Sequence, residues 1–229
     1  MTNQIKTGYK KTEIGVIPED WEVKKLGEVC AMKSGEGITS QSIDEHSEYP
    51  CYGGNGLRGF TKRFTHDGRY ALIGRQGALC GNVSNVEGKF FASEHAVVVT
   101  PFAQTDVQWL TPVLREMKLN QYSESSAQPG LSISKVLQLR LSIPSSKQEQ
   151  TAIAAALSDV DALMGELDKL IAKKRDIKQA TMQQLLTGKK RLVGFSGEWA
   201  VKRLGELATF FSGGTPSTSV AEYYNGNIP

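Results

Sequence analysis

The sequence contains little cysteine and no long apolar run, and each absence excludes a class of protein. Cys30, Cys51 and Cys80 are the three cysteines among 229 residues, and no C-x-x-C pair occurs. We therefore expect free thiols in a reducing compartment, not a disulfide framework or a zinc site. No stretch approaches the roughly 18 apolar residues that span a bilayer, and residues 1–11 lack the apolar core of a signal peptide. These absences predict a cytoplasmic protein without a membrane partner.

Signatures of catalysis are also missing. The sequence has no G-x-S-x-G, no P-loop and no Asn-Pro-Pro-Tyr motif. His46, His66 and His95 do not have metal-ligand spacing, and for the Glu94-His95 pair an exposed or core histidine is the simpler interpretation. Residues 54–59 fit G-x-G-x-x-G, but no helix start follows, which favours a surface loop. We expect no catalytic residue, no metal and no cofactor, which argues against a nuclease or a methyltransferase.

An internal repeat is present instead. Residues 21–28 read W-E-V-K-K-L-G-E, and residues 199–206 read W-A-V-K-R-L-G-E, so six of eight positions are identical. We call this octapeptide the repeated motif. Ser34-Gly35 recurs at the same offset as Ser212-Gly213. Residues 189–229 are therefore predicted to be the start of a truncated second repeat of a longer parent product, too short to bury a core.

Residues 1–146 are predicted to form a β-rich globular domain. Glycines punctuate residues 49–101 and separate short apolar runs that favour strands. The predicted strands are 69–73, 89–92, 96–100 and the alternating segment 137–143. Apolar residues at helical spacing predict a helix over 105–122, in which Pro112 is tolerated only in the first turn.

Residues 147–188 are predicted to be one long spacer helix. Residues 147–186 contain no proline and a single glycine, and Ser146 with Glu149 fits a capping box. The predicted helix-pairing residues are Ile153, Leu157, Val160, Met164, Leu167, Ile171, Ile177 and Leu185. A lone helix cannot bury such a stripe in water, so we expect an antiparallel coiled coil and an α+β fold. The alternatives are a core helix within one globular domain, or residues 189–229 folding back over part of the stripe.

The charge distribution points toward nucleic acid. The net charge is only +3, but residues 58–75 carry five basic side chains and one acid, whereas residues 13–48 are rich in acids. Arginine and lysine contact phosphates, while arginine, asparagine and glutamine can hydrogen-bond to base edges. The alternative is a solvated charged face.

The order of motifs resembles the DNA-specificity subunit of type I restriction–modification systems. The resemblance covers nearly the whole chain. It lies in the repeated motif with its downstream Ser-Gly and in the segments 49–56, 72–77, 81–83, 128–132, 143–144 and 148–150, which lead into the long helix.

The resemblance implies a non-catalytic DNA reader. Such subunits have two target-recognition domains, each followed by a long helix, and the two helices pack antiparallel as a ruler between half-sites in double-stranded DNA. They bind modification subunits, which hold S-adenosylmethionine, and recruit the restriction subunit. The implied DNA-binding residues are Ser34, Gly35, Asn55, Arg58, Lys62, Arg63, Arg75 and Gln76.

This chain differs from that pattern because it has one recognition domain and one complete helix. We therefore expect a homodimer that pairs two long helices and rebuilds a two-headed reader. The competing hypothesis is a scaffold that uses only the helix for protein–protein interaction and does not bind DNA.

Overall fold

A computed structural model describes residues 5–77, 79–124, 129–224 and 226. The chain divides into two units, Met1–Gly165 and Glu166–Pro229. This division lies inside the long helix α4 (Lys147–Leu186), and the predicted first domain, residues 1–146, lies wholly within the first unit. The first turns of α4 group with the first unit because they pack on it. We call the part of the first unit that precedes α4 the head.

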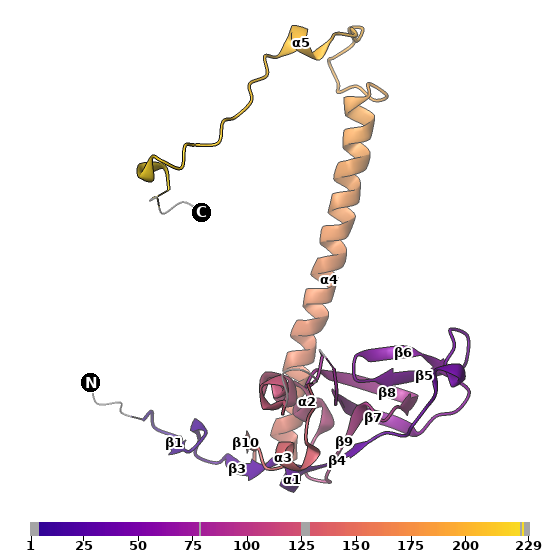
Figure 1. Cartoon of the computed structure of the whole chain (residues 1–229), viewed down its shortest axis with the longest axis vertical. Helices are drawn as coiled ribbons and strands as arrows, with labels where there is room; N and C mark the ends of the chain where they lie inside the picture. Colours follow the sequence, from indigo (N-terminus) through magenta and orange to yellow (C-terminus); the bar gives the residue numbers. More distant parts are fainter. Residues whose placement is uncertain (1–4, 78, 125–128, 225, 227–229) are drawn as a thin grey trace. The chain divides into compact units, whose positions relative to one another are not determined.

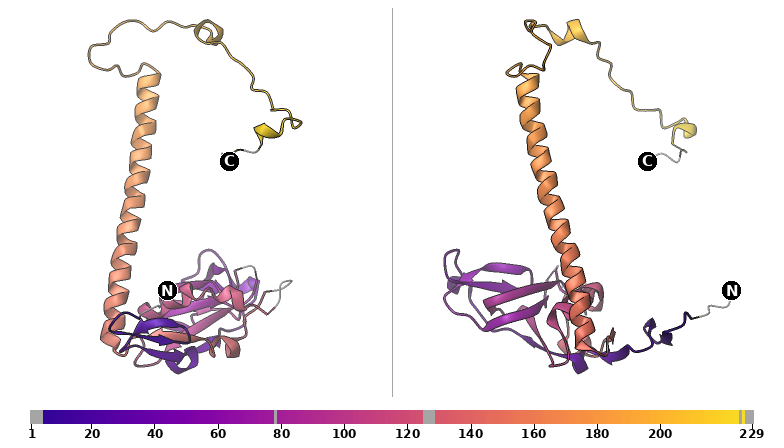
Figure 2. Two further views of the ribbon diagram at one scale, coloured as in Figure 1. Left: turned by 90° about the vertical axis from the view of Figure 1, so that its left-hand side faces the viewer. Right: turned by 180° about the vertical axis from the view of Figure 1, so that it is seen from behind.

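A six-stranded mixed sheet forms the centre of the head (Figure 1). Its order is β4-β9-β7-β8-β5-β6, and only β5 and β8 pair in parallel. The strands are β4 (Cys30–Ser34), β5 (Tyr49–Gly53), β6 (Gly56–Thr61), β7 (His66–Gly74), β8 (Val83–Ala92) and β9 (Ala96–Pro101). The predicted strands 69–73, 89–92 and 96–100 are confirmed within β7, β8 and β9. Figure 2 shows the same sheet from two further sides.

Two short strand pairs accompany this sheet. A hairpin joins β1 (Tyr9–Thr12) to β2 (Gly15–Pro18), and β3 (Glu22–Lys25) pairs antiparallel with β10 (Arg140–Ile143). The second pair brings the beginning and the end of the head together. The repeated motif supplies β3 and the following turn of helix, α1 (Leu26–Val29).

The strand predicted over 137–143 is shorter than expected. Residues before Arg140 belong to α3 (Ile133–Val136) and the turn after it. The carbonyls of Leu137 and Leu139 accept hydrogen bonds from the backbone N–H groups of Gly27 and Leu26 at 2.9 and 2.8 Å. The apolar alternation therefore continues through a turn whose carbonyls bond to α1, and only its last four residues pair as a strand.

Helix α2 (Val107–Glu116) corrects the expectation for Pro112. The helix is shorter than the predicted 105–122, because Lys118 takes φ +48° and the 3-10 helix η2 (Leu119–Tyr122) follows. Pro112 is the sixth helical residue, so the expectation that it lies in the first turn was wrong. An interior proline costs about 3 kcal/mol. Burial of Trp109, Leu110 and Leu114 on the sheet offsets this cost.

The predicted long helix is confirmed as α4, whose 40 residues span about 60 Å. Ser146 Oγ accepts a hydrogen bond from the backbone N–H of Glu149 at 3.1 Å, which is one half of the predicted capping box. The Glu149 carboxylate has a different partner from the one a capping box requires, because its Oε1 accepts from Trp21 Nε1. After the helix, Gly188 adopts φ +69°.

The main core of the head lies between the sheet and the helices packed against it. Leu26 and Leu110 are fully buried, and Ala154 of α4 joins the same cluster. A second, smaller cluster contains Phe90 and Val98. Helix α4 is fixed to this core by Gln150, which is 1% exposed. Its side chain accepts from the backbone N–H of Asp106 at 2.9 Å and donates to the carbonyls of Gln104 and Pro144.

The second unit contains the later turns of α4, the short helix α5 (Leu204–Leu207) and the 3-10 helix η3 (Ala221–Tyr223). Helix α5 reproduces α1 of the first copy, and both have extended caps, with C-cap ψ angles of 149° in α5 and 158° in α1. Leu204 and Leu207 are 70% and 64% exposed, whereas the equivalent Leu26 and Val29 are 0% and 2% exposed. In the described part of the chain, no helix combines the length and apolarity needed to cross a bilayer.

Candidate nucleic-acid interface

Arg75 lies where several segments of the head meet, just after β7. Its backbone N–H donates to the carbonyl of His95 and its carbonyl accepts from the N–H of Leu131, both at 2.9 Å. Its guanidinium Nη1 donates to Ser34 Oγ at 3.0 Å. Two predicted DNA-binding residues, Ser34 and Arg75, are therefore in direct contact, and Gln76 follows next in the chain.

Glycines allow these segments to approach closely. A Cβ on Gly35 would lie 2.1 Å from the Ala92 carbonyl oxygen, and one on Gly74 would lie 2.3 Å from that of Gly54. Neither backbone can move away easily, so only glycine fits at these two positions. The glycine-rich segments that the sequence marked as loops are packed against one another.

The β5–β6 hairpin carries Asn55 and Arg58. Gly56, with φ +84°, follows the turn at Gly54 and Asn55, and β6 continues as a strand. This geometry confirms that the G-x-G-x-x-G match is a hairpin and not the start of a helix. The Arg58 side chain lies over Gly53, where an added Cβ would meet its Cδ at 2.5 Å.

The predicted basic region is partly neutralised. Arg63 forms an ion pair with Glu36 at 2.8 Å and stacks over Phe91, and Arg69 pairs with Glu87 at 2.8 Å. No described carboxylate lies within ion-pair distance of Arg58 or Lys62. Both ion pairs are exposed and therefore contribute little to stability.

The turn Ser93–His95 is a neighbour that the sequence analysis did not assign to this surface. Ser93 donates its backbone N–H to the Tyr52 carbonyl at 2.8 Å, and His95 holds Arg75. Glu94 Oε1 lies 3.2 Å from His95 Nε2. The adjacency of Glu94 and His95 is visible in the sequence, but their place beside Arg75 depends on pairings between distant strands.

A hollow of about 560 Å³ opens beside Arg75 and Gln76. Its other lining residues are Glu124 and Gly130–Ser134. Gln76 forms an isolated β-bridge with Gly130, and Gly77 donates to the Pro129 carbonyl at 3.0 Å. The motif at 128–132 therefore lies against the predicted DNA-binding residues, although Gln128 itself is outside the described residues. We call the surface formed by Ser34–Gly35, Gly53–Arg58, Arg75–Gln76 and Ser93–His95 the glycine cluster face.

Most predicted helix-pairing residues of α4 are exposed. Leu157, Val160, Met164, Leu167, Ile171 and Ile177 are 46–58% exposed. Ile153 differs, because it packs against the core of the head at the anchored end of α4. Leu185 is half-buried and lines a small hollow with Trp199. Leu163 and Leu170, which the prediction left out, are also exposed.

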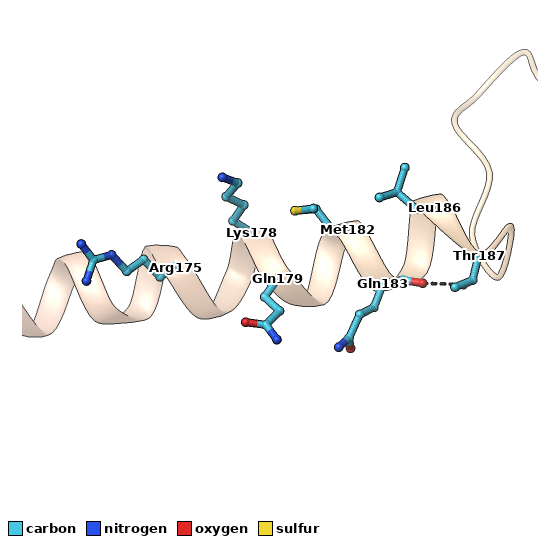
Figure 3. Close-up of a pocket in the computed structure, with 7 residues that line it drawn as sticks. All are labelled: Arg175, Lys178, Gln179, Met182, Gln183, Leu186 and Thr187. Atoms are coloured by element: carbon cyan, nitrogen blue, oxygen red, sulfur yellow. Dashed lines mark hydrogen bonds between the residues drawn. The ribbon is translucent and has the colours of Figure 1, made fainter. Parts of the chain in front are cut away.

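The last turns of α4 also expose apolar side chains (Figure 3). Met182 and Leu186 project from one side of the helix with Lys178, while Gln179 and Gln183 project from the opposite side. The side-chain hydroxyl of Thr187 donates to the Gln183 carbonyl. These side chains line a shallow hollow on the helix surface. Because one helix alone lines it, the hollow is an uncovered surface and not an enclosed site.

The described residues offer no cluster of three or more His, Cys, Asp or Glu side chains that could hold a metal. The three cysteines are free and buried. Burial raises the pKa of the Cys30 thiol to about 12. Burial also raises the pKa of Cys51, with Arg58 opposing and Glu94 reinforcing that shift. These thiols are structural groups of the core.

Comparison with known proteins identifies the family. The model of the "Type I restriction modification DNA specificity domain" matches residues 18–179. The chain belongs to this family. The match begins at the end of β2, includes the whole glycine cluster face and extends through most of α4.

Curated relatives of this specificity-domain chain carry the same designation. It is 46% identical over 151 residues to the "Type I restriction enzyme EcoprrI specificity subunit" of Escherichia coli, covering 64% of this chain and 37% of that protein. It is 26% identical over 260 residues to the "Putative type I restriction enzyme MjaX specificity subunit" of Methanocaldococcus jannaschii, covering 96% and 61%. Both are named specificity subunits, which supports the prediction of a non-catalytic component. The chain spans less than two thirds of either relative.

Solved specificity-subunit structures share the fold. The type I restriction–modification S subunit from M. genitalium aligns with a TM-score of 0.59 at 21% identity, over 72% of this chain and 45% of that one. The HsdS subunit from Thermoanaerobacter tengcongensis aligns with a TM-score of 0.55 at 15% identity, over 77% and 47%. The predicted α+β fold with a long helix is confirmed.

Proposed function

We propose that this chain recognises duplex DNA as a sequence-specificity subunit and reads one half of a bipartite target. The observation that carries the proposal is the glycine cluster face, which joins Ser34, Arg75 and Gln76 in a head that belongs to the DNA specificity family. The three free cysteines support the cytoplasmic location that we propose with it.

The chemistry of the glycine cluster face suits this role. Arg58 and Lys62 supply positive charge for phosphates, while Asn55, Arg75 and Gln76 carry the donors and acceptors that read base edges. Anchoring of Arg75 by Ser34 reduces the entropy that the guanidinium loses on binding. Gly35 offers its backbone to DNA on the same face, and Asn55 offers a short side-chain amide. Arg63 can leave Glu36 and pair with a phosphate instead.

Helix α4 supplies the second part of the proposal. Its exposed stripe of leucine, isoleucine, valine and methionine requires an apolar partner, and a second copy running antiparallel provides one with the same spacing. Such a homodimer carries two heads and reads a symmetric pair of half-sites. The remaining surface of α4 would dock the modification subunit, which brings S-adenosylmethionine, and the restriction subunit.

Selection of bound duplexes from a random DNA pool tests the DNA proposal. We expect a short enriched motif, and an affinity that falls about a thousandfold between about 50 and about 200 mM salt if some six phosphates are contacted. Selection should be run on the chain alone and with the modification subunit. Failure to enrich any motif in both formats would overturn the proposal and favour the scaffold alternative.

Substitutions that each remove one positive charge test whether DNA binds at the glycine cluster face or is attracted to positive charge anywhere on the protein. Arg58→Ala and Arg75→Ala should weaken binding about tenfold, whereas Arg175→Ala, on exposed α4, is the matched control and should change affinity little. Equal effects of all three variants would show that the interaction is nonspecific.

Sedimentation tests the homodimer. The wild type should sediment as a dimer at micromolar concentration, and Leu167→Glu, within the exposed stripe, should produce monomers. Ala172→Glu introduces the same charge outside the stripe and should leave the dimer intact. A wild-type monomer at these concentrations would rule out pairing through α4.

A further inference from the structure

The turn between β8 and β9 is held more firmly than a simple connection requires. Ser93 bonds to Tyr52 through its backbone N–H and to Ala96 through its carbonyl, at 2.8 and 2.9 Å, and it forms a parallel bridge with Glu36. A Cβ added to Gly54 would lie 3.2 Å from the His95 carbonyl oxygen. Hydrogen bonds and close packing therefore hold the backbone of this turn on several sides, and this fixes the positions from which the side chains of Ser93, Glu94 and His95 extend.

This turn also contains two buried polar atoms without a partner. Ser93 Oγ and Glu94 Oε2 make no hydrogen bond with any described residue. An unsatisfied buried polar atom costs about 1–3 kcal/mol, and such costs tend to persist at functional sites. The fold therefore keeps this turn in place despite the free-energy cost of its two unsatisfied polar atoms.

Glu94 lies against the ring of His95, with its Oε1 3.2 Å from His95 Nε2. A glutamate carboxylate can accept but not donate, so this contact favours the tautomer that carries its hydrogen on Nε2 and has Nδ1 as an acceptor. No described group bonds to Nδ1. The His95 side chain is 45% exposed, and its backbone holds Arg75.

We propose that His95 is a further specificity-determining residue that accepts a hydrogen bond from the exocyclic amino group of adenine or cytosine, and that Glu94 is its positioning residue. In the major groove, adenine and cytosine present amino donors, whereas guanine and thymine present acceptors at the equivalent places. An Nδ1 acceptor beside Arg75 therefore discriminates between these two pairs of bases. This inference rests on the proposed function.

The chain offers a variant set that distinguishes a base contact from a general charge effect. His95→Ala removes the acceptor, and Glu94→Ala removes the group that orients it. Glu94→Gln retains an oxygen that accepts from Nε2 but removes the negative charge. His46→Ala is the control, because His46 is an exposed histidine whose backbone N–H, and not its ring, donates to Asp44 Oδ1.

The experiment selects duplexes from a random pool with each variant and measures affinity for the wild-type motif and its single-base substitutions. We expect His95→Ala and Glu94→Ala to lose about tenfold discrimination at one motif position. Glu94→Gln and His46→Ala should keep it, and thermal unfolding should show that all variants are folded.

Three outcomes would overturn the inference. Unchanged motifs in His95→Ala and Glu94→Ala, with a wild-type motif present, would contradict the His95 contact and leave the proposed function intact. An equal affinity change on every sequence in both Glu94 variants would show that Glu94 acts only through its charge. Absence of a wild-type motif would overturn the proposed function and this inference together.

Discussion

The indole Nε1 of Trp21 donates a hydrogen bond to Oε1 of Glu149 over 3.1 Å, although 128 residues separate the two in the chain. Trp21 opens the repeated motif and Glu149 lies in the first turn of α4. The bond therefore joins the start of the head to the start of the spacer helix, beside the β3–β10 pair that closes the head. In the second copy, the equivalent Trp199 is 58% exposed.

Removal of the Glu149 carboxylate should loosen this junction. Glu149→Ala loses the bond to Trp21 and a negative charge at a helix N-terminus, so we expect the free energy of unfolding to fall by about 1–2 kcal/mol. Urea denaturation measures the change. Asp168→Ala, on an exposed part of the same helix, should stay within about 0.5 kcal/mol of the wild type. Equal losses in both variants would contradict a specific role for the junction.

Substitution of the buried Gln150 should lower the free energy of unfolding more than substitution of the exposed Gln148. Gln150→Leu leaves the Asp106 N–H and the Pro144 carbonyl without their side-chain partner in a buried place, and we expect a loss of about 2–4 kcal/mol. Gln148→Leu makes the same substitution at an exposed position and should be nearly neutral. Hydrogen exchange should also show faster exchange in the first turns of α4 only for Gln150→Leu. Unchanged protection there would argue against Gln150 as the anchor of the helix.

The backbone packing next to the glycine cluster face should not tolerate a single methyl group at Gly74, the residue before Arg75. Gly74→Ala places a Cβ 2.3 Å from the Gly54 carbonyl oxygen, so we expect a loss of about 2–3 kcal/mol and weaker DNA binding. Nothing lies within 4 Å of a Cβ on Gly37, so Gly37→Ala is the matched control and should have little effect. Thermal unfolding and DNA affinity would be measured together. A fully stable Gly74→Ala protein would show that the close approach is not required.

The Cys30 thiol predicts a loss of stability at high pH. Burial raises its pKa to about 12, while an unfolded thiol ionises near about 8.5. The folded state holds the proton more tightly, so its stabilising contribution is complete below about 8.5 and is lost as pH rises toward about 12. Between about pH 8 and about pH 10.5, Cys30→Ala should lose less stability than the wild type in denaturant titrations. Parallel losses in the two proteins would contradict this assignment.

Local patterns in the sequence determined the elements of this fold. Seven-residue spacing and the absence of proline over 147–186 predicted α4, and short apolar runs between glycines predicted three strands of the sheet. The repeated motif forms the same helical turn in both copies, α1 and α5, since a helix start depends on nearby residues. The motif order also predicted the family, because each motif is contiguous. These features depend on interactions within a few residues of one another.

Tertiary structure decided which of these segments contact one another and which basic side chains lack an acidic partner among the described residues. Pairing of β7 with β9 brings Arg75 beside His95, and the methyl-free surfaces of Gly35 and Gly74 allow that approach. Arg63 pairs with Glu36, although 27 residues separate them in the chain. Ile153 packs against the core because Gln150 anchors that end of the helix there. Pro112 is retained inside α2 because buried neighbours offset its cost. These results arise from contacts between residues far apart in the chain, and no short pattern in the sequence records them.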